Sequence, residues 1–496
     1  MVKHLSILAL LICIGQTYVT AQGQADTVIT YYGPENPNIR YVGRGDFSNP
    51  KRPVFSAPAV YIQANFIGVY ADVRFKDEYL YGQYLNNYSV IIDNQTVIHL
   101  QPSPSATDTI FGVVKDLAYG QHTITLIKRN ESGVCKFTFL GFGFKGTIAP
   151  MSNLPTRKIQ IFGNSISSGA ANLPGTCPTW NEQIQHSDAF RAFGPIVARA
   201  FNADYHLTSV SGIGLVRNYS NKYDARPLPA IYNLVHLNDQ TNVKRWNLNN
   251  FVPDVVLIEL GTNDFSPGDS ARPKMDTLVH KKAYISFIDT LKIYWPKAQY
   301  LIMGSPLLGD AWPDTSFHSR SDLIHVLTAV EQHYLSTKDT NVVYVPISKS
   351  NSPGCDGSHP SLQGQVDIAG QLAPVIVRKT GWPLDPDLAA NGFLDPLGDL
   401  DWTNDGIISA VEDKTAGSLI ELVLSPNPAE GEALVTWNTS GGFNLKIYDS
   451  KGTVVLERNG YGSALKMDIS HWAQGLYSVV VGLDNKSQKT AKLMVK

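Results

Sequence analysis

A serine, an aspartate and a histidine stand at positions from which they could together cleave an ester. Ser165 stands three residues after the end of the apolar run at 159–162, and Asp356 precedes His359 by three residues in one short segment. A serine hydroxyl needs a base to become a nucleophile, imidazole can supply one near neutral pH, and a carboxylate can orient that imidazole. We therefore interpret Ser165 as nucleophile, His359 as base and Asp356 as its orienting partner. Taken alone, a serine at a strand end is more often a helix cap, and an Asp-x-x-His segment is more often an ordinary loop.

Two further segments could supply hydrogen-bond donors to the same reaction. Gly212 lies in Ser-Val-Ser-Gly-Ile-Gly at 209–214, and Asn263 lies in Glu-Leu-Gly-Thr-Asn-Asp at 259–264. Attack on an acyl carbon puts negative charge on the acyl oxygen, and N–H groups aimed at that oxygen stabilise it. By itself each segment is an ordinary turn, so its meaning depends on whether the fold brings it to Ser165.

The elements around these segments predict an α/β domain over residues 155–382. Short apolar strands alternate with longer amphipathic stretches, which is typical of a parallel sheet with helices on both faces. The carboxyl ends of parallel strands form the ligand-binding edge of such sheets, so the four segments are expected to converge there. The predicted strands are 158–162, 205–210, 255–260, 299–304 and 342–345, and the predicted helices are 189–201, 275–294, 322–335 and 362–379.

Both flanks of this domain are predicted to be β-structure. Residues 27–147 contain short runs rich in Val, Ile, Tyr, Phe and Thr, separated by turns at 93–94 and 120–121, which is typical of a β-sandwich. Residues 383–421 form an acidic linker, and residues 422–496 return to short β runs that predict a small third β-sandwich. The sequence therefore predicts a multidomain chain.

In this order, the segments around Ser165, Gly212, Asn263 and His359 resemble the four sequence blocks of the SGNH/GDSL hydrolases, over roughly residues 158–380. The resemblance implies a three-layer α/β fold and an acyl-enzyme intermediate. It also implies an oxyanion hole made by the backbone N–H groups of Ser165 and Gly212 and the side chain of Asn263. No cofactor is implied for catalysis.

The chain departs from that family pattern at Asn164. The usual Gly-Asp-Ser of the family is Gly-Asn-Ser here, which removes a negative charge beside the nucleophile and leaves the three candidate catalytic residues in place. We expect this change to affect the conditions under which the reaction is fastest more than whether the reaction takes place. The sequence alone does not explain it.

The N-terminal sandwich resembles the jelly-roll domain of carbohydrate esterase family 2, through the segments at 39–44, 90–94 and 120–129. In that family the sandwich precedes an SGNH domain, and the resemblance implies removal of O-acetyl groups from polysaccharides such as acetylated xylan and glucomannan. The alternatives are an SGNH lipase or thioesterase, an esterase for another acylated glycan, and a noncatalytic glycan-binding protein. Presence of all three candidate catalytic residues argues against the last.

Two tryptophans are candidates for holding the sugar. An acetyl group is small, so specificity must come mainly from contacts with the sugar, for which aromatic faces are suited. Trp180 and Trp312 fall in predicted loops of the α/β domain. The alternative for each is an ordinary packing residue.

Both ends of the chain carry patterns typical of export. Residues 1–21 combine a lysine, a short apolar run and small residues at the end, which is the layout of a cleavable signal peptide. The segments at 424–428, 475–479 and 492–496 resemble the C-terminal sorting domain of type IX secretion. The resemblance implies a secreted or cell-surface protein recognised by the type IX secretion machinery. The alternative is a small carbohydrate-binding or spacer module.

The charge and hydropathy of the chain give no indication of nucleic-acid binding or of a membrane span. The formal net charge is -2 and charges of both signs are mixed along the chain, so no basic surface for nucleic acid is expected. The leading apolar run is shorter than the roughly 20 residues that a membrane span needs, and no later segment qualifies, so no membrane span is expected.

Export makes a disulfide plausible among the three cysteines that follow the predicted leader. Cys355 directly precedes the candidate orienting aspartate, and a bond from Cys177 to Cys355 would tie a loop near the nucleophile to the loop of the base. Cys135 would then stay unpaired. The alternative is three buried thiols.

The linker contains a candidate structural calcium loop at 401–412. Its spacing follows an EF-hand or dockerin-like loop, with a glycine at position 6 for the turn, although Thr403 stands where Asp or Asn is usual. A plain acidic linker is the alternative. The ligands would be Asp401, Thr403, Asp405, Ile407 and Glu412.

Overall fold

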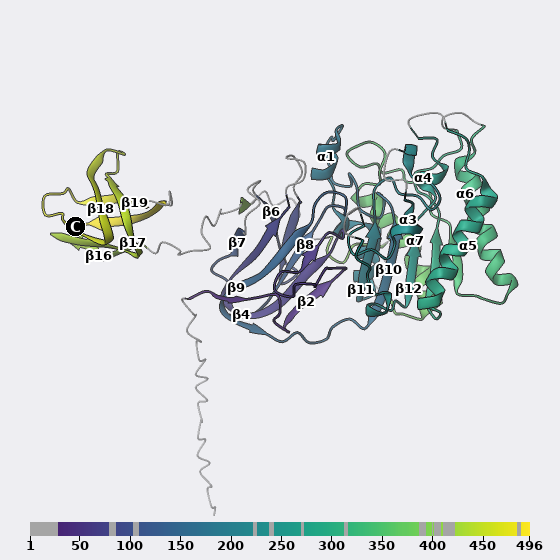
Figure 1. Ribbon diagram of the computed structural model, residues 1–496, viewed down its shortest axis with the longest axis horizontal. Helices are drawn as coiled ribbons and strands as arrows, with labels where there is room; N and C mark the ends of the chain where they lie inside the picture. The colour runs from purple at the N-terminus through teal and green to yellow at the C-terminus, as the bar shows by residue number, and fades with distance from the viewer. Residues whose placement is uncertain are drawn as a thin grey trace, which may run out of the picture. The chain divides into compact units, whose positions relative to one another are not determined.

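The computed structural model describes residues 28–78, 86–102, 109–221, 226–237, 243–268, 272–311, 316–385, 393–398, 400, 408–409, 422–483 and 488–496. The chain divides into two compact units, Met1–Val411 and Glu412–Lys496 (Figure 1). The first unit contains a β-sandwich followed by an α/β domain, and the described residues of the second form strands and their connections.

The α/β domain is built on a five-stranded parallel sheet in the order β11-β10-β12-β13-β14. The chain moves from β10 to β11 on one side and then returns to β12 on the other, so β10 lies at the point where ligands bind in such sheets. The predicted parallel sheet is confirmed, with strand ends that differ from the prediction by at most two residues. The strands are β10 (Arg157–Gly163), β11 (Ala203–Ser209), β12 (Val255–Ile258), β13 (Gln299–Met303) and β14 (Val342–Val345).

The long helices begin and end at residues suited to those positions. The Asp276 carboxylate accepts the N–H groups of Leu278 and Val279 at the start of α5, and Ser361 caps α7. The α7 helix ends at Gly381, whose φ of +71° favours glycine. The helices are α1 (Trp180–Gln185), α2 (Phe193–Ala200), α3 (Leu228–Ile231), α4 (Thr262–Phe265), α5 (Thr277–Tyr294), α6 (Ser319–Ser336) and α7 (Leu362–Thr380), with 3₁₀ turns η1 (Ala189–Arg191), η2 (Tyr219–Asn221) and η3 (Leu248–Asn250). None of the helices in the described part of the chain is long and apolar enough to cross a membrane.

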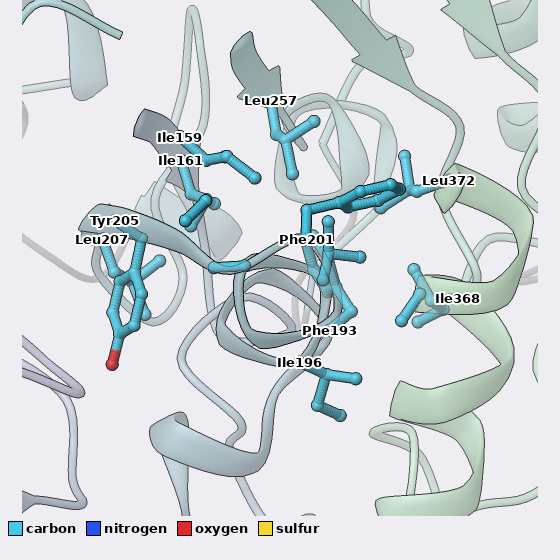
Figure 2. Packing of buried hydrophobic residues seen from close by; sticks show 14 of the residues in the cluster. Ile159, Ile161, Phe193, Ile196, Phe201, Tyr205, Leu207, Leu257, Ile368 and Leu372 are labelled. Carbon is cyan, nitrogen blue, oxygen red and sulfur yellow. The ribbon is translucent and has the colours of Figure 1, made fainter. Parts of the chain in front are cut away.

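Alternate residues of the parallel strands are buried on opposite faces of the sheet. Ile159 and Ile161 of β10 pack in one cluster with Phe193 of α2 and Leu372 of α7 (Figure 2). Phe162 belongs to a second buried cluster, which contains residues of α5 and α6. Continuous apolar strands are therefore required here, because both faces of the sheet are covered by helices.

One predicted helix, 189–201, is divided in the structure. Its residues form η1 and α2, separated by Ala192, whose φ of −84° and ψ of 160° are extended. The Phe193 N–H at the start of α2 donates to Gln365 Oε1 of α7 at 3.0 Å. The prediction of one continuous helix is wrong because the first N–H of the second helix donates to a side chain 172 residues away, and not to a carbonyl of a preceding turn.

The N-terminal domain is a jelly-roll-like sandwich of mainly antiparallel strands arranged around β4, which pairs with β2, β7, β8 and β9. The predicted turn at 93–94 is present, but the turn predicted at 120–121 is wrong, because both residues begin β8. The strands are β1 (Thr30–Tyr32), β2 (Ile39–Val42), β3 (Val54–Phe55), β4 (Tyr61–Asp77), β5 (Tyr88–Ile92), β6 (Thr96–Gln101), β7 (Thr109–Val114), β8 (Gly120–Lys128) and β9 (Phe137–Ala149), and β15 (Ile408–Ser409) pairs with β6.

The sandwich packs directly on the α/β domain. Ala59 and Ile127 of the sandwich belong to the same buried cluster as Tyr205 of β11, and the Tyr205 hydroxyl donates to the Ala59 carbonyl at 2.6 Å. The buried Arg44 donates to the carbonyl of Tyr232 at 2.5 Å. The two domains therefore share a core, and sandwich side chains can reach the edge of the parallel sheet.

The second unit forms a separate small β domain, as predicted. Its five strands follow the order β16-β20-β19-β17-β18 around a core that includes Val435, Leu445, Val479 and Leu493. The strands are β16 (Leu422–Glu430), β17 (Glu432–Tyr448), β18 (Val454–Asp468), β19 (Gly475–Leu483) and β20 (Gln488–Val495).

Candidate active site

The structure brings Ser165, His359 and Asp356 together at the carboxyl edge of the parallel sheet. His359 Nε2 lies 2.8 Å from Ser165 Oγ, and His359 Nδ1 lies 2.5 Å from Asp356 Oδ2. A carboxylate on Nδ1 keeps a proton on that nitrogen and leaves Nε2 to accept the proton of the serine hydroxyl. This arrangement can remove the hydroxyl proton as Ser165 Oγ attacks an electrophilic carbon.

Asp356 is held by its own loop. Its Oδ1 accepts the N–H groups of Ser358 and His359 at 2.9 Å each, and its Oδ2 accepts the Ser358 hydroxyl at 2.9 Å. Burial alone would raise the pKa of Asp356, but the hydrogen bond and charge of His359 and the other donors outweigh burial and hold the pKa well below its usual range. Asp356 therefore stays ionised over the range in which an imidazole titrates.

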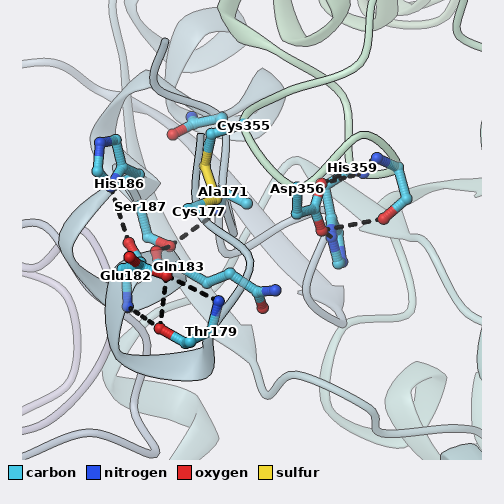
Figure 3. The surroundings of a disulfide bond; sticks show 12 residues. Ala171, Cys177, Thr179, Glu182, Gln183, His186, Ser187, Cys355, Asp356 and His359 are labelled. Atoms are coloured by element: carbon cyan, nitrogen blue, oxygen red, sulfur yellow. Dashed lines mark hydrogen bonds and ion pairs between the residues drawn. A yellow bond between two sulfur atoms is a disulfide. The ribbon is translucent and has the colours of Figure 1, made fainter. Parts of the chain in front are cut away.

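A disulfide anchors this loop (Figure 3). Cys177 and Cys355 are bonded, with Cα atoms 5.2 Å apart, and the Cys355 N–H donates to the Ala171 carbonyl at 3.0 Å. Cys135 is buried and lies outside this bond. The orienting carboxylate thus follows directly after a covalent link to the segment beyond the nucleophile.

The turn that carries Ser165 rests on a buried carboxyl group. Asn164 Nδ2 donates to Glu259 Oε1 at 3.1 Å, and Asn164 Oδ1 accepts the Ile166 N–H at 2.9 Å. Burial raises the pKa of Glu259 to about 8, although Asn164, Thr262 and Ser167 all donate to it. An aspartate at position 164 could not donate and would place a second carboxyl group against Glu259. This contact supplies a physical reason for the Gly-Asn-Ser sequence.

A loop at residues 211–217, named here the glycine loop, begins two residues after the end of β11. Its far end is fixed by the buried Asp264, which accepts the N–H groups of Leu215, Val216 and Arg217 at 2.9, 2.7 and 3.0 Å. Burial raises the pKa of Asp264, but the facing His280 and these donors outweigh burial and leave the pKa below its usual value. Asp264 therefore fixes the conformation of the glycine loop at this end.

Gly212 and Asn263 meet at this loop. Gly212 has a φ of +76°, which glycine adopts readily and other residues do not. Asn263 Nδ2 donates to the Ile213 carbonyl at 2.7 Å, which uses one of its two hydrogens. Because Gly163 of β10 pairs with Ser209 of β11, the glycine loop starts beside the turn that carries the nucleophile.

Glu131 of the sandwich also reaches the glycine loop, although it is not among the residues predicted from the sequence. Its Oε2 accepts the Ser211 N–H at 2.7 Å, and the neighbouring Ser132 hydroxyl donates to the Ser209 carbonyl at 2.8 Å. Burial raises the pKa of Glu131. The polar Arg-Asn-Glu-Ser segment after β8 has the composition of an exposed turn, so the sequence carries no signal for this contact.

Trp180 is the one candidate sugar-binding residue among the described positions. It begins α1, is 41% exposed, and lines a small cavity together with Glu131 and Ser211. The predicted signal peptide at 1–21 lies outside the described residues. So do Trp312 and the candidate calcium ligands Asp401, Thr403, Asp405, Ile407 and Glu412.

A hydroxyl, an imidazole and a carboxylate joined in this order are the arrangement that serine hydrolases use, and their place at the edge of a parallel sheet defines the α/β class of these proteins. Models of three protein families match the chain. Residues 41–152 match the carbohydrate esterase 2 N-terminal model, residues 159–372 match the GDSL-like lipase/acylhydrolase model, and residues 424–496 match the secretion system C-terminal sorting domain.

Curated relatives and a solved structure agree with these matches. The chain is 32% identical over 269 residues to an acetylxylan esterase/glucomannan deacetylase of Cellvibrio japonicus, covering 52% of this chain and 70% of that protein. It is 30% identical over 352 residues to the cellulase/esterase CelE of Acetivibrio thermocellus, covering 70% of this chain and only 40% of that protein. A family two carbohydrate esterase from Clostridium thermocellum in complex with cellohexaose superposes with a TM-score of 0.60 and 27% identity, over 70% of this chain and all of that one.

The chain belongs to carbohydrate esterase family 2, with its sandwich as the N-terminal domain and its α/β domain as the GDSL-like part. Its second unit is a secretion sorting domain, which indicates a protein sorted for secretion.

Proposed function

We propose that this protein is a secreted serine esterase that removes O-acetyl groups from polysaccharides through an acyl-enzyme intermediate. The observation that carries the proposal is the chain of contacts from Ser165 Oγ to His359 Nε2 and from His359 Nδ1 to Asp356, at 2.8 and 2.5 Å. Family membership directs the proposal toward acetylated polysaccharides.

The proposed reaction has two halves. Ser165 Oγ attacks the acetyl carbonyl carbon while its proton passes to His359 Nε2, and the resulting tetrahedral intermediate collapses as His359 returns the proton to the departing sugar oxygen. Water then attacks the acetyl-serine ester, again through His359, and releases acetate. Asp356 stabilises the imidazolium in both halves and is not itself protonated.

The intermediate carries a negative oxygen that needs donors. The backbone N–H groups of Ser165 and Gly212 and the Asn263 amide are the proposed set. Removing one such donor typically lowers the rate about 10²- to 10³-fold. Since the triad and these donors supply acid–base catalysis and charge stabilisation, we propose no cofactor for the chemical step.

The proposed substrate is a β-linked polysaccharide chain bearing acetyl esters. The Clostridium thermocellum relative was solved with cellohexaose, which supports recognition of an extended sugar chain. In this chain the exposed ring of Trp180, which lines the cavity reached by Glu131, is the proposed stacking surface for a sugar. Trp312 is a second candidate from the sequence.

Acetate release from acetylated xylan, glucomannan and mannan tests this function. We expect release by the wild type and loss of at least 10³-fold in Ser165→Ala. Turnover of p-nitrophenyl acetate by the wild type without release from any glycan would retain the esterase and reject the substrate. Equal turnover of p-nitrophenyl acetate by the wild type and Ser165→Ala would reject the catalytic claim and favour a glycan-binding role. Preference for longer p-nitrophenyl acyl chains would favour a lipase or thioesterase.

Two further proposals concern the segments outside the catalytic unit. Deleting residues 423–496 is expected to leave esterase activity intact while the protein stays in the cell, because this domain would be recognised by type IX secretion machinery. If the loop at 401–412 binds calcium, a chelator should lower the melting temperature. An unchanged melting curve would argue for a plain acidic linker.

A further inference from the structure

The segment that carries Glu131 is held firmly by the sandwich. Lys128 is fully buried, and its ammonium group donates to the carbonyls of Asn130 and Glu131 at 2.7 and 2.8 Å. Next to it, Arg129 pairs with the buried Asp188 of the α/β domain at 3.2 Å. Because the segment is bonded both to the sandwich and to the α/β domain, the Glu131 carboxylate is presented at a fixed place.

Glu131 uses this fixed place to hold the glycine loop. Its side chain is buried, and Oε2 accepts the Ser211 N–H at 2.7 Å, which is a short hydrogen bond. Ser211 is the residue directly before Gly212, whose backbone N–H is the proposed donor to the reacting oxygen. The contact therefore acts one peptide unit away from the chemistry.

A glycine loop needs such a contact more than other loops do. Gly212 and Gly214 have no side chains to restrict their backbones, so the conformation of the loop depends on its hydrogen bonds. Close along the chain, the Gly214 N–H donates to Asn218 Oδ1 at 3.0 Å and the Gly212 carbonyl accepts the Tyr219 N–H at 2.7 Å. Asp264 fixes the far end of the loop, and the near end is fixed by Glu131 and by the Ser132 hydroxyl on the Ser209 carbonyl. A displacement of about 1 Å in a donor is enough to lower a rate by about 100-fold.

We propose that Glu131 is a positioning residue for the esterase reaction, because its carboxylate holds the Ser211 N–H and thereby sets the direction of the Gly212 N–H. The sandwich then contributes to catalysis itself and is more than a neighbouring module. This inference rests on the proposed acyl transfer at Ser165 and does not depend on the proposed polysaccharide substrate.

Two conservative variants test separately whether the length or the charge of the Glu131 side chain is required. Glu131→Asp keeps the negative charge but is shorter by one methylene, so its carboxylate cannot reach the Ser211 N–H from the same backbone. Glu131→Gln keeps the length and an acceptor oxygen but loses the charge. Glu331→Asp is the matched control, because Glu331 of α6 also accepts one backbone N–H, that of Tyr344 at 3.2 Å, and makes no contact with the glycine loop.

The experiment measures kcat and KM for p-nitrophenyl acetate on the full chain. We expect Glu131→Asp to lose at least tenfold in kcat with KM within about twofold, since the donor acts on the transition state. Glu131→Gln should stay within about threefold of the wild type, as should Glu331→Asp. Retention of more than half of the wild-type kcat by Glu131→Asp, or equal losses in Glu131→Asp and Glu131→Gln, would overturn the proposal.

The rate of Ser165 labelling by a fluorophosphonate gives the same comparison without ester turnover. Attack on phosphorus also develops negative charge on an oxygen, so the labelling rate should fall in Glu131→Asp and persist in Glu131→Gln. If the wild type is labelled at Ser165 but hydrolyses no ester, the proposed function fails and the positioning role is still decided by the labelling rates. Melting curves of all variants show whether a loss reflects unfolding.

Discussion

Two loops meet at Ser165, and they are held in place in opposite ways. The histidine loop, residues 354–360, is held mainly by its own atoms. Asp356 accepts the N–H groups of Ser358 and His359, and the Gly354 N–H donates to the His359 carbonyl at 2.6 Å. The geometry between carboxylate and imidazole is therefore set within a few consecutive residues.

The glycine loop depends instead on distant parts of the chain. Asp264, 47 to 49 residues along the chain, accepts three of its N–H groups, and Glu131, 80 residues before it, accepts another. Local bonds from the Gly214 N–H to Asn218 Oδ1 and from the Tyr219 N–H to the Gly212 carbonyl add to this support. A self-contained loop can be recognised in a sequence as a motif, whereas a loop supported from outside shows only its glycines.

The largest expected effect comes from the histidine loop. Asp356→Asn should lower kcat for p-nitrophenyl acetate about 10³- to 10⁴-fold, because an amide can hold the imidazole in the wrong tautomer and cannot stabilise its charge. Ser358→Ala is the control, since it removes only the hydroxyl bond to Asp356 and should stay within about threefold. Retention of a tenth or more of the activity by Asp356→Asn would show that this loop is not the unit that orients the base.

The second effect concerns the external support of the glycine loop. Asp264→Asn should lower kcat about 10- to 100-fold, because an amide accepts these N–H groups less strongly and turns its own NH₂ toward one of them. The melting temperature should fall as well, since three buried backbone N–H groups lose a charged acceptor. Asp276→Asn also replaces a carboxylate that accepts backbone N–H groups, but it only caps α5 and should change neither quantity appreciably. Unchanged kcat in Asp264→Asn would contradict the idea that the loop is held from outside.

This difference explains which parts of the molecule the sequence could predict. The parallel strands were identified because their apolar runs must be buried on both faces, and the histidine loop was identified because its residues lie within six positions. Glu131 was not predicted, because a single glutamate in a polar segment after a strand belongs to no periodic pattern and to no local motif. Its significance depends on the packing of two domains.

Two other features that the sequence left unpredicted or unexplained have the same origin. The break at Ala192 depends on Gln365 from α7, and Asn164 becomes understandable only when Glu259 is seen beneath it. The turn predicted at 120–121 failed for another reason, because a glycine can also begin a strand, as Gly120 does in β8. Local composition could not determine any of these three features.

The third prediction tests whether the histidine loop truly supports itself. Replacing both Cys177 and Cys355 by serine should lower the free energy of unfolding by about 2 to 4 kcal/mol, because the bond closes a long chain segment. The activity at temperatures well below melting should stay within about threefold, since the bonds around Asp356 remain. Denaturant unfolding and kcat, both compared with Cys135→Ala, measure the two effects. A tenfold loss of kcat in the folded variant would mean that the disulfide, rather than the loop itself, sets the geometry.

The smallest expected effect concerns the nucleophile turn, which lies between the two loops and rests on Glu259. The pKa of this carboxyl group is about 8 in the folded protein, above its ordinary value of 4.5, so the folded state keeps a proton that the unfolded chain releases. The stabilisation is complete below about pH 4.5 and is lost as the pH rises toward 8. Glu259→Gln cannot titrate, so from pH 5 to 8 the wild type should lose about 1 to 3 kcal/mol relative to this variant, or a few degrees in Tm.

Thermal unfolding at several pH values measures this difference between the wild type and Glu259→Gln. Asp72 and Asp77 also have pKa values raised to about 6 by burial, but they titrate equally in both proteins and cancel in the comparison. If the two Tm curves stay parallel from pH 5 to 8, Glu259 does not hold its proton, and the Asn164 amide must be facing a carboxylate. Asn164→Asp should then be far more damaging than the loss of one hydrogen bond, because two ionised groups would share the space beneath Ser165.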